Sequence, residues 1–404
     1  MALDVWRAGT RARRYYPTPP DAARRAAGGR RALSPTFVPT LLADLLTPAP
    51  LVDLDRLAHN LDRMAAYAAV HGLAMRPHVK THKSTRVAAE QLRLGAVGLT
   101  CATPRELEVM SDVTASLLLA HPPVGSAKLA RVMALPKTVR LTVALDAAPA
   151  AAALSTAADL AQREVDVLVE VDLGMHRVGV QGAAECVALA QRVARTPSLR
   201  FAGVLFYPGH VRQRLGEQGP ALAQVSADLA RVLAALDDAG YPAPVVSGGS
   251  TPAAWRMHEL AGITEVRPGT YVYNDRMQAR VGACEWDDCA LTVLATVVST
   301  AVPGQAVVDA GSKALGREPL DVGGADASAE GDGALLDRPD VRVVRMSEEH
   351  GILDLRDTDW RPEVGDQVRI VPNHACIVVH LNDAMHGVRG EVVETSWPVS
   401  ARGR

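Results

Sequence analysis

Two hydrophobic patterns divide the chain near residue 276. In the first part, short apolar runs rich in β-branched residues alternate with longer segments that repeat apolar positions at helical spacing. Because parallel strands that are covered on both faces show continuous apolar runs, this alternation predicts strand–helix units in series. The expected strands begin near residues 51, 74, 96, 116, 139, 165, 201, 245 and 265.

The helical segments between these runs have recognisable ends. Residues 55–70 and 221–239 place apolar side chains at helical spacing, and Gly72 and Gly240 follow them, as left-handed C-terminal caps prefer. About eight strand–helix units in roughly 225 residues predict a (β/α)8 barrel of the TIM type, which is an α/β fold. A doubly wound open sheet is the alternative.

The second part of the chain has a different texture. Valine-rich alternating runs are punctuated by proline and glycine, and long helical patterns are missing, which predicts a β domain. We therefore expect an N-terminal arm over residues 1–44 that packs partly on the β domain, a barrel over 45–275 and a C-terminal β domain over 276–404. The Gly-, Asp- and Ala-rich residues 321–334 predict a surface loop.

Length and charge narrow the classes of protein. The 404 residues suffice for two domains, and 48% apolar residues allow a large core. A net charge of −2 with interspersed acids and bases argues against a nucleic-acid-binding protein. Five cysteines, an odd number in a long chain, suggest no disulfide framework and favour the reducing cytoplasm. No apolar run of about 18 residues is present, so we expect no membrane helix.

The N-terminal segment is rich in arginine. Its first 33 residues hold eight arginines but no continuous apolar stretch, so a secretory signal is not indicated. An organelle transit peptide is one reading of such a segment. The acidic Asp4 and Asp21, together with several prolines and glycines, favour a loose arm or a segment that wraps around a dimer partner.

Unusual polar residues follow four of the expected strands. In a parallel barrel, catalytic groups gather at the C-terminal ends of the strands, so these residues should lie around one mouth. They are Lys80 after the run at 74, Asp172 and Arg177 after the run at 165, Tyr207 and His210 after the run at 201, and Gly248–Gly249 after the run at 245.

The stretch "RPHVKTHKS" places Lys80 among other cationic side chains. A lysine acts as a covalent catalyst when it is partly desolvated and near other cations, which lower its pKa. Arg76 and His78 are suitable neighbours. The alternative is a solvated lysine that opens a helix, because "THKS" resembles a helix start.

Two further motifs suggest an anion site and a metal site. Residues 247–250, "SGGS", follow a strand and precede a possible helix, so their N–H groups could bind a phosphate; an ordinary tight turn is the alternative. In "PNHAC", His374 and Cys376 alternate along an expected strand and would share one face. This soft pair suits zinc and leaves positions for water or substrate. A buried cysteine beside an incidental histidine is the alternative.

Taken together, these motifs resemble a known family. The chain is similar to the pyridoxal-phosphate enzymes with an alanine-racemase-like barrel, in the branch of D-threonine aldolase and eukaryotic-type D-serine dehydratase. The resemblance covers roughly residues 45–395. It rests, in order, on "RPHVKTHKS", "VEVDLGMHRVGV", "YPGH", "SGGSTP", "EVRPGTYVYND", "DAGSKAL", "SEEHG" and "PNHAC".

The resemblance implies a cofactor site in the barrel. Lys80 would form the Schiff base with pyridoxal 5'-phosphate, Arg177 would reach the phenolic oxygen of the cofactor, and Arg267 would meet its pyridine nitrogen. The remaining cofactor-binding residues would be His78, Tyr207 and Thr270, with Gly248, Gly249 and Ser250 holding the phosphate. His374 and Cys376 would bind a divalent metal, with zinc favoured and manganese the alternative. The family also implies a homodimer whose β domain closes over the partner's barrel mouth.

The metal pair guides the choice of reaction. A Lewis acid assists dehydration, which expels the β-hydroxyl, and retro-aldol cleavage, which deprotonates it. Racemisation instead needs a second base and no metal. A His–Cys pair resembles zinc-dependent D-serine dehydratases, while aldolases of the family tend to carry His–Asp. We therefore expect a lyase that dehydrates D-3-hydroxy amino acids such as D-serine, with Lys80 taking the α-proton. D-threonine aldolase-type cleavage is the alternative, and a non-catalytic pyridoxal-phosphate-binding protein or a racemase is the alternative from another class.

Overall fold

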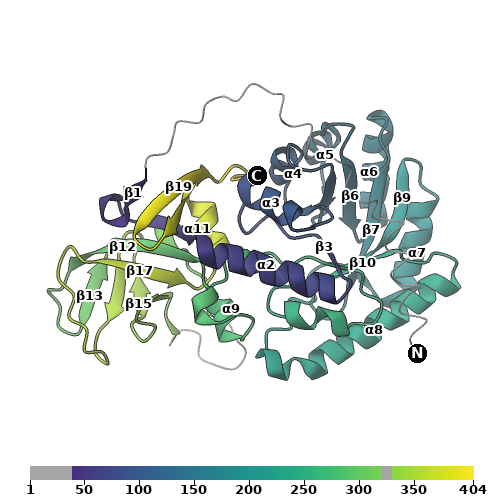
Figure 1. The fold of residues 1–404 in the computed structure, drawn as a ribbon. Helices are drawn as coiled ribbons and strands as arrows, with labels where there is room; N and C mark the ends of the chain where they lie inside the picture. Colours follow the sequence, from purple (N-terminus) through teal and green to yellow (C-terminus); the bar gives the residue numbers. More distant parts are fainter. Residues whose placement is uncertain (1–38, 321–329) are drawn as a thin grey trace.

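The computed structural model describes residues 39–320 and 330–404. A barrel of parallel strands and a mostly antiparallel sheet lie side by side, and helix α2 (Leu54–Val70) runs across the front of both (Figure 1). Most of the predicted N-terminal arm, residues 1–38, lies outside the described residues. Strand β1 (Thr40–Leu41) at its end pairs with β19 (Val392–Pro398) of the antiparallel sheet.

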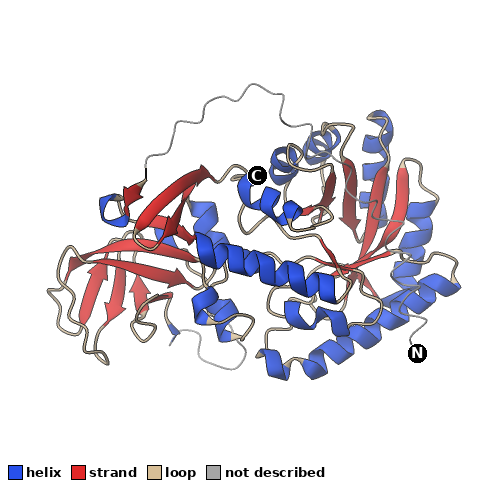
Figure 2. Cartoon of the chain, in the orientation of Figure 1, coloured by secondary structure: helices blue, strands red, loops and turns tan. Residues whose placement is uncertain are grey.

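Eight parallel strands follow one another in chain order around the barrel. Helices lie outside these strands (Figure 2). The strands are β3 (Ala74–Met75), β4 (Leu99–Cys101), β5 (Ser116–Leu119), β6 (Arg140–Leu145), β7 (Val165–Asp172), β9 (Leu199–Leu205), β10 (Val245–Gly248) and β11 (Glu265–Val266); β8 (Val180–Gln181) pairs with the end of β7. The helices are α3 (Thr85–Arg93), α4 (Pro104–Met110), α5 (Ser126–Met133), α6 (Ala148–Leu160), α7 (Gly182–Ala194) and α8 (Gly219–Asp238).

The sheet closes between its first and second strands. Beyond β3, the chain pairs with β4: Thr100 N–H donates to Pro77 O at 2.9 Å, and Val79 N–H donates to Thr100 O at 2.9 Å. On the other side β3 pairs with β11. The predicted (β/α)8 barrel is thereby confirmed, and the open doubly wound sheet is excluded. The helix ends expected at Gly72 and Gly240 are confirmed too, with φ of 63° and 80°.

Alternate strand residues separate an inner and an outer layer of the barrel. One set packs against the helices in the main core, and the other forms a separate inner cluster: Leu118, Ala144, Leu168, Ala202, Leu205 and Val245. Because side chains alternate along a strand, the residue two positions after Leu168 on β7 also faces inward, one layer nearer the C-terminal mouth. That residue is Glu170.

The second sheet forms the body of the C-terminal part and includes an early strand. Its strands are β1, β2 (Ala49–Asp53), β12 (Leu291–Ser299), β13 (Gln305–Val308), β14 (Gly333–Leu335), β15 (Val343–Met346), β16 (Gly351–Asp354), β17 (Gln367–Pro372), β18 (Ala384–Arg389) and β19. The run at residue 51 was expected in the barrel, and this expectation is wrong: β2 pairs with β12 and β18. A short apolar run shows that a strand is buried but does not show which sheet buries it.

Two further expectations for this part need correction. The run that contains His374 was expected as one strand, but β17 ends at Pro372 and helix α11 (Ala375–Leu381) follows. A seven-residue apolar run fits either element, so periodicity could not decide. Of the loop expected over 321–334, residues 321–329 lie outside the described residues, while Gly333 and Ala334 belong to β14.

Two absences expected from the sequence are found in the described residues. All five cysteines are free thiols. In the described ranges, no helix combines the length and apolar character needed to cross a bilayer.

Candidate active site

A cavity of about 190 Å³ lies at the C-terminal mouth of the barrel. Nine of the eleven predicted site residues line it, and they come from the ends of five strands and from the second domain. These are His78, Lys80, Arg177, Tyr207, Gly249, Ser250, Arg267, Thr270 and His374. Gly248 and Cys376 do not line the cavity but lie directly behind it, as the contacts below show.

Lys80 lies in a turn, and its side chain faces the cavity. His82 N–H and Lys83 N–H both donate to Val79 O, and α3 begins only at Thr85. Lys80 therefore does not open a helix, although it is exposed, as the alternative of a solvated lysine expects. Lys80 Nζ lies 6.0 Å from the centre of the Tyr207 ring.

Neither of the two cationic neighbours expected for Lys80 acts as an uncompensated positive charge. Desolvation lowers the pKa of His78 well below its usual value, and the positive charges of Lys80 and Arg267 lower it further, so the imidazole is neutral. Arg76 Nε is paired with buried Glu265 Oε2 at 2.7 Å. That part of the sequence argument was wrong, because the carboxylate that neutralises Arg76 lies 189 residues away in the chain.

The glycine-rich loop after β10 has the features of an anion site. A Cβ on Gly248 would lie 2.2 Å from the Phe206 ring, and Gly249 has a φ of 109°, so both positions require glycine. Ser250 Oγ is buried and has no hydrogen-bond partner among the described residues. An unpaired hydroxyl is costly unless a ligand completes its hydrogen bonds, and a phosphate oxygen would do so. The expected helix after the loop is only the 3-10 turn η5 (Ala254–Glu259), so the loop itself must supply the donors.

Arg267 enters the floor of the cavity from β11. Its side chain is 5% exposed, and its guanidinium donates to Ser247 Oγ at 2.6 Å and to Phe206 O at 2.9 Å. Burial lowers the pKa of Arg267 to about 10, while Glu265 opposes this shift. The guanidinium stays charged at neutral pH and is held rigidly.

Arg177 stands on a turn that is fixed at its base. Asp172 Oδ1 accepts from the backbone N–H groups of Gly174 and His176, each at 3.0 Å. Asp172 therefore shapes this turn and is not itself in the cavity. The exposed Arg177 guanidinium lies 4.7 Å from the centre of the Tyr207 ring.

Glu170 was missed by the sequence argument and is the buried acid of the cavity. It is 3% exposed, it lines the cavity floor, and Oε2 has no hydrogen-bond partner among the described residues. Burial raises the pKa of Glu170 to about 7, although the positive charges of Arg267 and Arg177 lower it. A charged residue at an inward position of the apolar run "VDVLVEVD" was the available signal.

His374 and Cys376 meet at the start of α11, against the barrel mouth. Cys376 Sγ lies 3.2 Å from Thr81 Oγ1 and 3.9 Å from Thr270 Oγ1. Burial would raise the pKa of the thiol, but His374, Lys80 and Thr81 lower it to about 7. The His374 and Cys376 side chains interact, but Cys376 lies in helix α11 and His374 directly precedes it, so they do not share one face of a strand; their role as metal ligands stays a prediction.

Asp275 orients His374 and was also missed. This fully buried carboxylate lies 3.1 Å from His374 Nδ1 and accepts from Ala375 N–H at 3.0 Å. Since a carboxylate can only accept, Nδ1 carries a proton. Cys376 and Asp275 raise the pKa of His374 to about 11, so Nε2 would bind a metal by exchanging its own proton for the ion. In the described parts of the chain, no group of three or more His, Cys, Asp or Glu side chains forms a complete cage. Two soft donors with such support fit an open site for a divalent metal.

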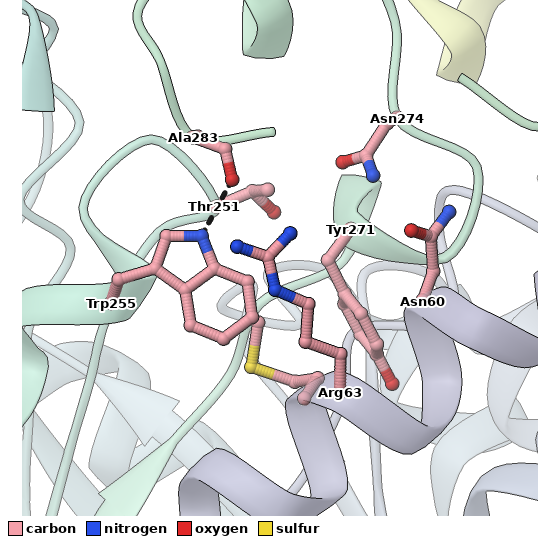
Figure 3. A pocket seen from close by; sticks show the side chains of 8 residues that line it. Asn60, Arg63, Thr251, Trp255, Tyr271, Asn274 and Ala283 are labelled. Atoms are coloured by element: carbon pink, nitrogen blue, oxygen red, sulfur yellow. Dashed lines mark hydrogen bonds between the residues drawn. The ribbon is translucent and has the colours of Figure 1, made fainter. Parts of the chain in front are cut away.

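A second cavity, between α2 and the loop after β10, is too small for a cofactor. Figure 3 shows its lining, with Arg63 over the Trp255 ring and the Trp255 Nε1–H bond to Ala283 O. Its volume of about 10 Å³ holds one water at most. Thr251 lines both cavities, so this packing supports the loop after β10 from behind.

The geometry agrees with comparisons to known proteins. Two family models match in order, "Alanine racemase, N-terminal domain" over residues 52–277 and "Putative serine dehydratase domain" over residues 290–388. A D-threonine aldolase from an Arthrobacter species is 33% identical over 374 residues, which covers 90% of this chain and 94% of that protein. The chain belongs to the D-threonine aldolase and D-serine dehydratase family.

Other members of the D-threonine aldolase and D-serine dehydratase family match over similar lengths. D-threo-3-hydroxyaspartate dehydratase from Delftia sp. (strain HT23) is 35% identical over 354 residues, covering 83% of this chain and 92% of that protein. The crystal structure of D-threonine aldolase from Filomicrobium marinum has a TM-score of 0.82 at 34% identity, covering 91% of this chain and 98% of that one. These relatives are pyridoxal-phosphate-dependent lyases, so the expected enzyme class is confirmed.

Two solved variants of a D-threo-3-hydroxyaspartate dehydratase have one residue replaced by alanine. One variant lacks a histidine; the other lacks a cysteine two positions later and is in the metal-free form. Their TM-scores are 0.79 and 0.80, at 32% and 33% identity; they cover 86% and 89% of this chain, and 93% and 98% of theirs.

Proposed function

We propose that this enzyme is a pyridoxal-phosphate- and divalent-metal-dependent dehydratase of D-3-hydroxy amino acids. The observation that carries the proposal is the pairing of His374 with Cys376 at the mouth that Lys80 faces. The same His-x-Cys spacing separates the residues substituted in the two dehydratase variants, one of which is metal-free.

The cavity residues fit the cofactor in three places. Lys80 would hold pyridoxal phosphate covalently through Nζ. The loop from Gly248 to Ser250 would bind the phosphate, which would give Ser250 Oγ the hydrogen-bond partner that it lacks. Arg177 would donate to the phenolic oxygen. When bound, the cofactor supplies the electron sink for the electrons left at the substrate Cα.

Different residues of the chain would assist different parts of the elimination reaction. Lys80 would take the α-proton once its amine is no longer bound to the cofactor, because the released amine is a base located at the reacting carbon. His374 and Cys376 would hold a metal ion that binds the β-hydroxyl and makes it a better leaving group, by several kcal/mol. Loss of water followed by hydrolysis gives a keto acid and ammonia, so D-serine would yield pyruvate.

Retro-aldol cleavage is the second candidate. It is favoured by the D-threonine aldolases that match this chain at 33% and 34% identity. The same lysine and metal would serve it, with the β-hydroxyl deprotonated instead of expelled. D-threonine would then give glycine and acetaldehyde.

Product identification separates these reactions. The holoprotein is incubated with D-serine, D-threonine and their L-isomers, and the products are assigned by mass spectrometry. The proposal predicts keto acids from the D-isomers only, abolished by Lys80→Ala and by a chelator, and restored by zinc better than by manganese. An aldehyde plus glycine would support the aldolase, and the enantiomer alone would support a racemase. Cofactor binding without turnover would make it a non-catalytic binding protein.

The proposal extends to the assembly. We propose a homodimer in which the β domain of one subunit would cover the barrel mouth of the other, as the family resemblance implies. Light scattering coupled to size-exclusion chromatography should give twice the 42.8 kDa mass of the chain. A monomer with full activity would contradict this.

A further inference from the structure

The cavity contains a buried acceptor without a donor and an exposed donor without an acceptor. Glu170 Oε2 lies at the floor with no hydrogen bond among the described residues. Arg177 lines the same cavity, and its guanidinium lies over the Tyr207 ring without a hydrogen bond or ion pair to any other described residue. A buried carboxylate that lacks a donor is costly, so a ligand-bound state that pairs these two groups would be favoured.

Arg177 is better suited than Arg267 to supply the missing donor. Both arginines line the same cavity as Glu170, and the positive charges of both lower its pKa. However, Arg267 is 5% exposed and already donates to Ser247 Oγ and Phe206 O. Turning it toward Glu170 would break two buried hydrogen bonds, whereas Arg177 would exchange only a ring contact and water.

The backbone beneath Arg177 is rigid, which limits the change to its side chain. Asp172 Oδ1 accepts from two N–H groups of the turn, and Gly179 N–H donates to Asp146 Oδ2 at 3.0 Å. A Cβ on Gly179 would lie 2.4 Å from the backbone nitrogen of Asp172, so the two arms of the turn are in direct contact. Such a support can present a guanidinium at one place once its rotamer is fixed.

We propose that Glu170 is the positioning residue of Arg177: in the cofactor-bound enzyme the guanidinium bridges the Glu170 carboxylate and the phenolic oxygen of pyridoxal phosphate. This inference rests on the proposed function, because it needs the cofactor in this cavity. A guanidinium has five donors in a planar fork, so it can bind two anionic oxygens at once. Glu170 would thereby hold an exposed cation in one position.

A double-mutant cycle on cofactor affinity tests this coupling without relying on turnover. The dissociation constant of pyridoxal phosphate is measured by absorption for the wild-type protein, Glu170→Gln, Arg177→Gln and the double variant. We expect Glu170→Gln to weaken binding roughly tenfold when Arg177 is present and less than about twofold when it is absent. Equal losses in both backgrounds would overturn the proposal, since Glu170 would then act on another donor or on the fold alone.

The absorption spectrum supplies a signature that a structural role would not give. Because Arg177 favours the deprotonated phenolic oxygen, Glu170→Gln and Arg177→Gln should shift the bound cofactor toward its short-wavelength band in the same way. Glu170→Asp should restore part of the long-wavelength band. Glu318→Gln is the matched control, because Glu318 lines the same cavity but has an exposed side chain. A spectrum of Glu170→Gln identical to the wild type would overturn the proposal.

A structure of the wild-type holoenzyme needs no variant and covers the case in which Glu170→Gln fails to fold. The proposal requires a Glu170 carboxylate oxygen within 4 Å of an Arg177 guanidinium nitrogen. Arg177 still stacked on Tyr207, with Glu170 bonded to another group, would overturn it. If the protein takes up no pyridoxal phosphate, the proposed function fails as well; if cofactor and turnover are present without the coupling, only this inference fails.

Discussion

Replacing the buried acid of the cavity should stabilise the cofactor-free enzyme in a pH-dependent way. Burial raises the pKa of Glu170 from its ordinary value of 4.5 to about 7. Arg267 and Arg177 oppose this rise, and Asp146 and Asp172 add to it. The folded protein therefore holds a proton between these two pH values that the unfolded chain has released.

The sign and size of the effect follow from proton linkage. Below about pH 4.5 the group is protonated in both states and costs nothing; as pH rises through 7 the folded state must carry a buried charge, and stability is lost. A rise from 4.5 to about 7 corresponds to a loss of about 3 kcal/mol above pH 8. Glu170→Gln removes the charge, so the variant should gain up to about 3 kcal/mol over the wild type at pH 8 but only about 1 kcal/mol at pH 5.

Thermal unfolding of the cofactor-free proteins from pH 5 to pH 8.5 is the assay. The difference in Tm between Glu170→Gln and the wild type should grow with pH and level off above about pH 8. Glu318→Gln, at an exposed carboxyl of the same cavity, should show no such growth. A Glu170→Gln variant that is less stable than the wild type by the same amount at every pH would refute the reasoning.

Three other substitutions test separate parts of the site. Gly248→Ala places a methyl group 2.2 Å from the Phe206 ring, so it should destabilise the protein by about 1–3 kcal/mol and weaken cofactor binding. An unchanged unfolding curve in denaturant would show that the loop can move to accept the methyl group. Asp275→Asn removes the acceptor that orients His374 and should lower metal affinity roughly 10–100-fold in a chelator competition, and unaltered affinity would mean that Asp275 serves only the fold. Cys376→Asp replaces a soft ligand by a hard one, so the metal that best restores activity should change from zinc toward manganese, and the parent ranking would contradict the ligand assignment.

The barrel and its mouth were predictable because they depend on local patterns. Parallel strands buried on both faces give continuous apolar runs, and strand ends give the positions of Lys80, Arg177 and Tyr207. The run at residue 51 was misassigned because its neighbours in the sheet, β12 and β18, lie more than 200 residues away. No local pattern carries that pairing.

The charge states of the site residues were harder to predict from the sequence than the identities of those residues. His78 is neutral because of burial, which the sequence does not display. Glu170 sits in an apolar run and shows its role only when the barrel brings Arg267 and Arg177 around it. Asp275 is 99 residues from the imidazole that it orients. Charges that act across the fold can be assigned only after the fold is known.

The central claim is that the Lys80 amine holds the cofactor, and peptide mapping after borohydride reduction tests it most directly. We expect a stable pyridoxyl-phosphate mass on the peptide that contains Lys80. Lys83, three residues away, should stay unmodified, because its Nζ is buried in an ion pair with Glu106 at 2.6 Å. An unmodified Lys80 in a protein saturated with pyridoxal phosphate, or the label on another lysine, would contradict the account.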